Sequence, residues 1–395
     1  MRSAFRNGHR PMDSFDIFPE GLRSNLFSAA GAQWHRVRQI MTPTFSSGKL
    51  KMMDSHINTC SAHLIDNMKK AINKGERIDV KKVYGGFTMD AIARTAFGIE
   101  INSQEDLNHP FVKDASLLLS FVSSNPWYRV LLTAVPFLMT VVKFLVTYVF
   151  KQQGWTPFSE TVLRIIQQRK SEGRCAQKHT DFLQMILDYE DNEKPENKRL
   201  KSLSDAEVLG QAVVIFLGGY ETTSTTLQFL SYNLALHPDG DVTYEGVAKL
   251  KYLDCAINET LRMYPAVNIV NRLASETVTI KGVTIPKGAG VLIPIVNVLN
   301  DPEYFPEPDK FIPERFSEEN KGSRNPMAFL SFGYGPRLCI GMRLALLEIK
   351  IAMVHVLRAV KFIKTDDLQG KIGILPGTLV STADRPVLLK AELRD

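Results

Sequence analysis

Hydrophobic residues recur every three or four positions along much of the first half of the chain. This spacing runs from Trp34 to about Ile101, and again from about Pro157 to Tyr189. Side chains at such intervals share one face of an α-helix, which can then bury them together. The first half of the chain is therefore predicted to be mostly helical.

A long apolar helix is expected next, from Ser204 to about His237. Ser204 is followed three residues later by Glu207, which is the pattern of a capping box. The length of this helix predicts that it crosses the whole core. A last helix is expected from Arg343 to Val360. Its apolar side is formed by Leu344, Leu347, Ile351, Val354 and Leu357.

The pattern changes after Ser275, where short runs of β-branched residues replace the helical spacing. Residues 277–280 and 283–286 flank Lys281 and Gly282, a pair suited to a tight turn, and residues 291–293 follow. These runs predict a small β-sheet. No internal repeat or low-complexity linker divides the chain, so we expect residues 1–395 to form one mostly α domain with a minor β part.

The segment 130–150, VLLTAVPFLMTVVKFLVTYVF, is long enough to suggest a transmembrane span. Pro136 and Lys143 lie inside it, and a charge in mid-span costs about 3 kcal/mol. We therefore favour a membrane-dipping interfacial segment over a span or a core hairpin. The first twenty residues are polar and carry no apolar stretch, so no signal peptide or anchor is expected in this chain.

Charge and cysteine content exclude several classes of function. The chain has 48 Lys and Arg against 42 Asp and Glu, a net charge of +6, and no basic run interleaved with aromatic residues. No nucleic-acid function is therefore expected. The four cysteines are far apart and include no CxxC pair, which argues for a reducing, cytosol-facing compartment.

The strongest candidate for chemistry is the loop 332–341, FGYGPRLCIG. Cys339 lies at the start of a predicted helix, where backbone N–H groups and the helix dipole favour a thiolate. The neighbouring glycines allow the backbone to approach a flat ligand closely. A lone cysteine is usually a buried small hydrophobe, and we interpret Cys60, Cys175 and Cys255 in that way.

The spacing of residues excludes a nucleotide-binding loop here. Gly333 and Gly335 lack the third glycine of a dinucleotide fingerprint, and no complete phosphate loop is present. The sequence also has no HExxH motif and no serine nucleophile elbow.

The loop resembles the haem-binding signature FxxGxRxCxG of the cytochrome P450 family. The resemblance implies haem b as cofactor, with Cys339 as the fifth iron ligand and Phe332 among the haem-binding residues. It makes Arg337 a partner of a haem propionate, a role that suits a planar, permanently charged side chain. Thiolate ligation favours O–O cleavage.

The sequence 218–223, GGYETT, resembles the oxygen-activating motif of the same family. It lies in the middle of the long apolar helix, where each glycine costs roughly 1 kcal/mol against alanine. The resemblance implies that Glu221 and Thr222 support proton delivery, and the missing side chains would leave room for dioxygen. The alternative is that Thr222 only hydrogen-bonds the carbonyl four residues back and bends the helix.

Further motifs agree with the resemblance. Trp34 and Arg38 match a WxxxR pair, and Arg272 matches another arginine, all of which reach haem propionates in the family. Glu259, Arg262 and Arg315 match a structural triad, which we assign to holding the haem-side core. Phe216, Ala266 and Val267 are expected near the substrate.

Four segments most resemble the microsomal branch that contains the 3A subfamily and the thromboxane synthases. They are 43–50 (PTFSSGKL), 181–184 (DFLQ), 219–223 (GYETT) and 341–343 (GMR). This implies a monooxygenase at the cytosolic face of the endoplasmic reticulum membrane that oxidises steroids, fatty acids and foreign compounds. NADPH-cytochrome P450 reductase would supply its electrons.

Two departures from the family pattern leave alternatives open. The chain starts well inside the pattern, so the anchor and first sheet strands would be missing, and about one helix of the pattern has no counterpart after Asp239. We therefore keep two alternatives: a thromboxane-synthase-like endoperoxide isomerase, and a non-catalytic haem-binding remnant.

Overall fold

The computed structural model describes residues 24–103, 105–106, 108–123, 156–172, 180–192, 202–237, 251–320, 322, 325–365, 371–376, 378 and 380–394. The α-helices in this part of the chain are α2 (Gly31–Met41), α3 (Ser47–Asn73), α4 (Val80–Phe97), α5 (Pro110–Ser123), α8 (Thr156–Glu172), α9 (Phe182–Asn192), α11 (Asp205–Leu236), α13 (Lys251–Met263), α14 (Ile295–Leu299) and α15 (Met342–Ala359). The strands are β1 (Ile78–Asp79), β2 (Ile269–Leu273), β3 (Val278–Ile280), β4 (Val283–Ile285), β5 (Gly290–Pro294), β6 (Val360–Ile363) and β7 (Leu388–Leu393). Short 3-10 turns lie at Thr42–Phe45, Pro313–Phe316 and Gly335–Arg337.

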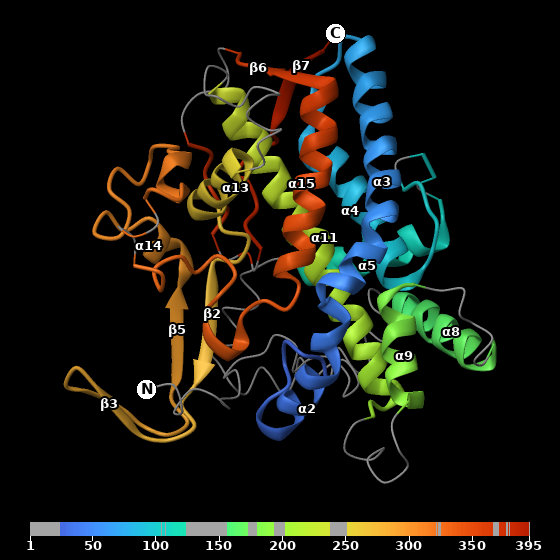
Figure 1. Ribbon diagram of the computed structural model, residues 1–395, viewed down its shortest axis with the longest axis vertical. Helices are drawn as coiled ribbons and strands as arrows, with labels where there is room; N and C mark the ends of the chain where they lie inside the picture. The colour runs from blue at the N-terminus through green and yellow to red at the C-terminus, as the bar shows by residue number, and fades with distance from the viewer. Residues whose placement is uncertain are drawn as a thin grey trace.

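Helix α11 runs through the middle of the molecule and contacts α4, α13 and α15 (Figure 1). The Ser204 hydroxyl accepts from the Glu207 N–H, and the Glu207 carboxylate accepts from the Ser204 N–H, so the predicted capping box is present. Residues 223–235 are all buried. The prediction of a long helix that crosses the core is confirmed.

Glu207 also connects α11 with α2. Its carboxylate accepts hydrogen bonds from the side chains of Gln33 and Arg36. Arg36 in addition donates to the carbonyl of Ser202, at 2.5 Å. The start of α11 is therefore attached to the helix that carries Trp34 and Arg38.

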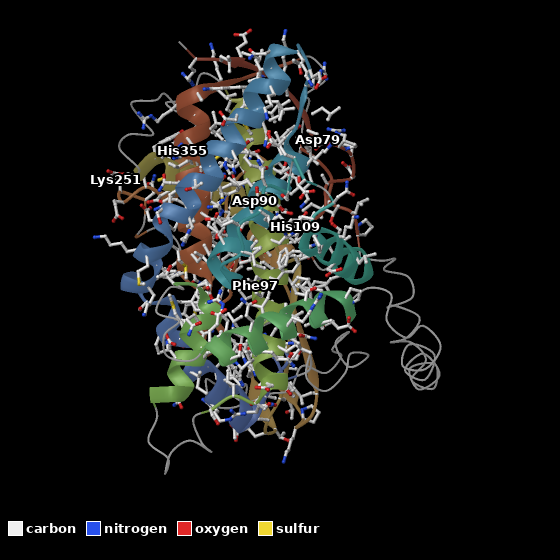
Figure 2. All side chains as sticks on the ribbon, turned by 90° about the vertical axis from the view of Figure 1, so that its right-hand side faces the viewer. Asp79, Asp90, Phe97, His109, Lys251 and His355 are labelled. Atoms are coloured by element: carbon white, nitrogen blue, oxygen red, sulfur yellow. The ribbon has the colours of Figure 1, made fainter. Side chains whose placement is uncertain are left out.

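Helix α4 packs against α11 at close range. Asp79 caps its first turn by accepting from the Lys82 N–H, and Figure 2 shows Asp79 and Phe97 at the two ends of the helix. A Cβ atom on Gly219 would lie 2.7 Å from Ile92 Cδ1, inside van der Waals contact. Gly219 is therefore required for the approach of the two helices.

Three small sheets accompany the helices. β7 lies between β1 and β6, β2 pairs with β5, and β3 pairs with β4, all antiparallel. The turn between β3 and β4 places Lys281 and Gly282 at φ of 47° and 81°, as a type I′ hairpin requires. The expected hairpin is confirmed, but the β part begins earlier than Ser275, because β2 precedes it.

Helix α15 forms at the expected place, but its buried face differs from the expected one. Leu347, Ile351 and Val354 are only half-buried. The buried residues are Leu344, Glu348, Ile349, Ala352, Met353, Val356 and Leu357. Apolar residues surround much of this helix, so its neighbours α3 and α11 decide which side is covered.

The segment 130–150 lies outside the described residues, and its membrane-dipping role stays a prediction. Within the described part of the chain, no helix combines the length and the hydropathy needed to cross a membrane. The mostly helical fold with a small β part is confirmed.

Candidate functional site

Cys339 lies at the end of a tightly folded loop before α15. Its N–H donates to the Phe332 carbonyl at 2.9 Å, and the Leu338 N–H donates to the Gly335 carbonyl at 3.0 Å. Gly333 and Gly335 adopt φ of 77° and 78°, a region that L side chains rarely enter. The glycines therefore allow the turn that presents Cys339 at the start of the helix.

The surroundings of the Cys339 sulfur act on its charge in opposite directions. Burial raises the pKa of the thiol, whereas N–H groups of Gly341 and Met342 and the positive charge of Arg38 lower it. The net pKa is raised, so the helix start alone does not produce the expected thiolate; a bound metal ion deprotonates a coordinating thiol. The residue is nevertheless accessible to solvent.

Trp34, Arg337 and Arg38 converge on the same region from α2 and the cysteine loop. The Arg337 guanidinium lies over the Trp34 ring, 4.4 Å from its centroid, and donates to the Ala29 carbonyl at 2.8 Å. Arg38 is close enough to Cys339 for their charges to interact. The structure therefore brings together Trp34, Arg38, Arg337 and Cys339, four of the predicted site residues. The carbonyl of Phe332 accepts the hydrogen bond from the cysteine N–H.

Arg38 and Arg272 share a second property: each is partly removed from water. Burial lowers the pKa of both side chains. Arg272 donates to the Asn271 carbonyl at 2.7 Å, and neither arginine forms an ion pair within the described part of the chain. Haem would bring two propionate carboxylates for such cations and an iron for the accessible cysteine, so these residues fit the group.

The middle of α11 is accessible to solvent, in contrast to the residues that follow it. A Cβ atom on Gly218 would meet nothing within 4 Å, and residues 214–215 and 217–222 are exposed or half-buried. The Thr222 hydroxyl donates to the Gly218 carbonyl at 2.5 Å, so the bond of the alternative interpretation is present. Gly218 and Thr222, one turn apart, therefore share the open side of the helix.

Glu221 is held from the neighbouring helix by a residue that the sequence did not single out. Lys81, in the first turn of α4, forms an ion pair with it at 2.7 Å. Lys81 and Lys82 are adjacent in the sequence, and only the packing of α4 shows which of them faces α11.

The three residues expected near the substrate lie in different surroundings. Phe216 is fully buried among the rings of Phe111, Phe158 and Tyr220, with centroid distances of 4.7 to 5.9 Å. Ala266 is buried and accepts from the Ser381 N–H, and Val267 forms a bridge with Val380. No hydrogen bond or ring contact between described residues joins these three to the cysteine loop.

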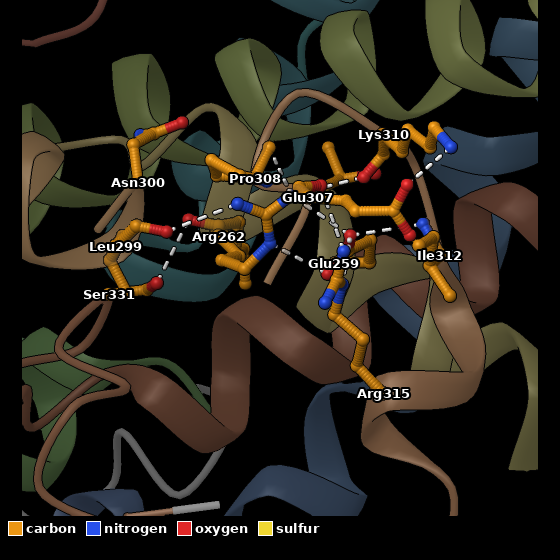
Figure 3. A network of polar contacts seen from close by, with 12 residues as sticks. Glu259, Arg262, Leu299, Asn300, Glu307, Pro308, Lys310, Ile312, Arg315 and Ser331 are labelled. Atoms are coloured by element: carbon orange, nitrogen blue, oxygen red, sulfur yellow. Dashed lines mark hydrogen bonds and ion pairs between the residues drawn. The ribbon is translucent and has the colours of Figure 1, made fainter. Parts of the chain in front are cut away.

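The predicted structural triad is present (Figure 3). Both Glu259 oxygens accept from Arg262, at 2.9 Å each, and one also accepts from Arg315 at 3.3 Å. Glu259 and Arg262 are fully buried. Arg262 donates in addition to the carbonyls of Leu299, Pro308 and Lys310, so the buried charges are well hydrogen-bonded.

Glu348 is a buried acid that was not singled out from the sequence. It lies on the buried face of α15 near Thr223 of α11, and burial raises its pKa to about 8. The sequence feature that could have identified Glu348 is its place one turn after Leu344 on an otherwise apolar helix. Because its burial favours the neutral form, the Glu348 carboxyl ionises at higher pH than an exposed carboxyl does.

Comparisons with known proteins show the family of this chain. A family model described as Cytochrome P450 matches residues 3–390. Cytochrome P450 3A7 of Homo sapiens is 37% identical, covering 95% of this chain and 77% of the relative. Cytochrome P450 3A12 of Canis lupus familiaris is 36% identical, covering 95% and 76%, and cytochrome P450 3A28 of Bos taurus is 36% identical, covering 94% and 76%. The mostly helical fold, the cysteine loop and these matches agree, and the chain therefore belongs to the cytochrome P450 family of haem b monooxygenases.

Proposed function

We propose that this monooxygenase oxidises small lipophilic molecules such as steroids, fatty acids and foreign compounds. NADPH-cytochrome P450 reductase would supply the electrons. In the net reaction the substrate, dioxygen, NADPH and one proton give a hydroxylated product, NADP+ and water. The observation that carries the proposal is the accessible Cys339 sulfur beside the desolvated Arg38.

The chain's own residues divide the work. Cys339 would bind the iron through its sulfur, while Trp34, Arg38, Arg272 and Arg337 would hold the propionates and Phe332 supports the loop. When bound, haem supplies the redox chemistry that activates dioxygen.

Glu221 and Thr222 would move protons on the open side of α11. A hydroxyl can donate and accept at once, so Thr222 can accept a hydrogen bond from water while it donates to the Gly218 carbonyl. The Glu221 side chain is 27% exposed, so water can reach its carboxylate.

Ala266 and Val267 would line the substrate side. Phe216 has no exposed surface, so we assign it to supporting the wall behind Tyr220. We further propose that residues 1–395 form one domain, that the segment 130–150 dips into a membrane, and that the enzyme acts at the cytosolic face of the endoplasmic reticulum.

The iron ligand is tested by the absorbance spectrum of the reduced, carbon-monoxide-bound protein. The unaltered chain should show the red-shifted Soret band of a thiolate haem, and Cys339→Ala should lose it. Cys60→Ala is the control, because burial raises the pKa of the Cys60 thiol to about 12 and keeps it protonated. An unchanged band in Cys339→Ala would refute the ligand, and absence of reductase-dependent oxidation of testosterone or lauric acid would refute the activity.

A further inference from the structure

The Lys81 ammonium makes three contacts with one face of α11. It donates to the Glu221 carboxylate at 2.7 Å, to the Thr225 hydroxyl at 2.9 Å and to the Ser224 hydroxyl at 3.2 Å. These acceptors are spaced at i, i+3 and i+4, so they lie on the same side of the helix. An ammonium has three donors, and all three are used here.

The packing of α4 on α11 fixes the distance between Lys81 and Glu221. A Cβ on Gly219 would clash with Ile92, and a Cβ on Gly85 would lie 3.2 Å from the Tyr220 hydroxyl oxygen. The two helices therefore cannot separate or slide without losing these close contacts. Lys81 meets Glu221 as part of a rigid helix pair.

The ion pair lies where the partly exposed middle of α11 meets the buried second half of the helix. The Lys81 and Glu221 side chains are 33% and 27% exposed, whereas residues 223–235 are buried. Glu221 also precedes Thr222, whose hydroxyl lies on the open side of the helix. Its carboxylate is thus partly exposed to water and lies one residue before the hydroxyl of Thr222 along the helix.

We propose that Lys81 is a positioning residue for proton uptake: it holds the Glu221 carboxylate at the solvent boundary of α11, from which protons reach Thr222. This inference rests on the proposed function, because it assigns a role within the same reaction. Without Lys81 the Glu221 carboxylate is free to rotate into solvent, and the delivery of protons to Thr222 is disrupted.

The balance of products reports on this role. Hydroxylation converts substrate, dioxygen, NADPH and one proton into product, NADP+ and water. When proton delivery is disrupted, dioxygen, NADPH and one proton instead give hydrogen peroxide and NADP+. The fraction of NADPH electrons found in product therefore measures proton delivery separately from electron supply.

The test compares Lys81→Met with Lys82→Met, which removes an exposed neighbouring ammonium. With testosterone, reductase and NADPH, Lys81→Met should lower the product per NADPH at least about threefold. It should also raise hydrogen peroxide and enlarge the solvent deuterium isotope effect on product formation. Lys82→Met should match the unaltered chain, and Lys81→Arg should recover about half of the loss, because it keeps the positive charge.

Two further measurements separate the ways in which the test could fail. The carbon monoxide spectrum should be the same in all variants, and a changed band in Lys81→Met would overturn a role confined to proton delivery. In chemical unfolding, the losses in free energy of unfolding for Lys81→Met, Glu221→Gln and the double variant should be non-additive; additive losses would show that the ion pair is absent.

If the unaltered chain oxidises testosterone but Lys81→Met keeps its product yield and isotope effect, the role of Lys81 is wrong and the proposed function stands. An inactive unaltered chain with a non-additive cycle would refute the proposed function and, with it, the role in proton uptake.

Discussion

The guanidinium of Arg337 lies over the indole ring of Trp34, 4.4 Å from its centroid. One residue comes from α2 near the start of the described chain, and the other from the loop that presents Cys339. Arg337 also donates to the Ala29 carbonyl, just before α2. The two distant segments therefore fix each other's position around the candidate haem site.

Removing the ring of Trp34 should weaken haem retention. A partly desolvated cation–π contact contributes about 1–2 kcal/mol, so Trp34→Ala should release haem to apomyoglobin roughly 5 to 30 times more readily. Trp34→Phe keeps an aromatic face and should lose less. Equal retention in Trp34→Ala and the unaltered chain would contradict the role given to this contact.

The two arginines on Glu259 should differ in their contribution to stability. Arg262 is fully buried and donates to both Glu259 oxygens, whereas Arg315 donates to only one of them, at 3.3 Å, and is 11% exposed. Breaking a buried pair costs about 3–5 kcal/mol, so Arg262→Met should lower the free energy of unfolding by that amount. Arg315→Met should lose less than half as much. Urea unfolding monitored by circular dichroism measures both, and similar losses would be inconsistent with this geometry.

Glu348 should make stability fall as pH rises. Its folded pKa is about 8 against an ordinary value of 4.5, so the folded chain prefers the neutral carboxyl. The contribution is therefore fully present below pH 4.5 and is lost as pH rises through 8. At pH 7 the stability lost relative to pH below 4.5 has an upper bound of ~3 kcal/mol.

Glu348→Gln removes this dependence while keeping the shape of the side chain. The variant should gain stability over the unaltered chain progressively between pH 5 and pH 8. Urea midpoints measured at several pH values test this. A constant difference across that range would show that Glu348 does not titrate in the folded state as expected.

Gly218 and Gly219 provide a matched pair of adjacent positions on α11. Gly219→Ala places a Cβ 2.7 Å from Ile92 Cδ1, and overpacking of this kind costs about 1–3 kcal/mol. Gly218→Ala meets nothing within 4 Å and should raise stability by up to roughly 1 kcal/mol, because alanine favours helix. Thermal unfolding of the two variants should shift in opposite directions. Destabilisation by Gly218→Ala would mean that its open side is filled.

Structural features that depend on residues close together in the sequence, such as caps, turns and the extent of a helix, were predicted from local sequence patterns. The capping box of Ser204 and Glu207, the turn at Lys281 and Gly282, and the extent of α15 all formed as expected. The glycine-rich loop around Cys339 and the triad of Glu259 were also identified, because their residue types and order are distinctive.

Features set by packing between distant segments were not predictable in the same way. Ile351 and Ile349 are equally apolar, and only contacts with α3 and α11 select the buried face of α15. The choice between Lys81 and Lys82 depends on the rotation of α4 about its axis. The enclosure of Phe216 by rings of α5 and α8 likewise depends on segments far from it in the sequence.

Glu207 has a consequence that reaches beyond the helix it begins. The same carboxylate closes the first turn of α11 and ties down Gln33 and Arg36 of α2. A substitution there would loosen the opening turn of one helix and tilt the other, together with Trp34 and Arg38 on it. Glu207 takes no part in the chemistry, yet it supports both α11 and the helix that carries Trp34. Inherited variation at this position would therefore appear as poor haem loading in an otherwise folded enzyme.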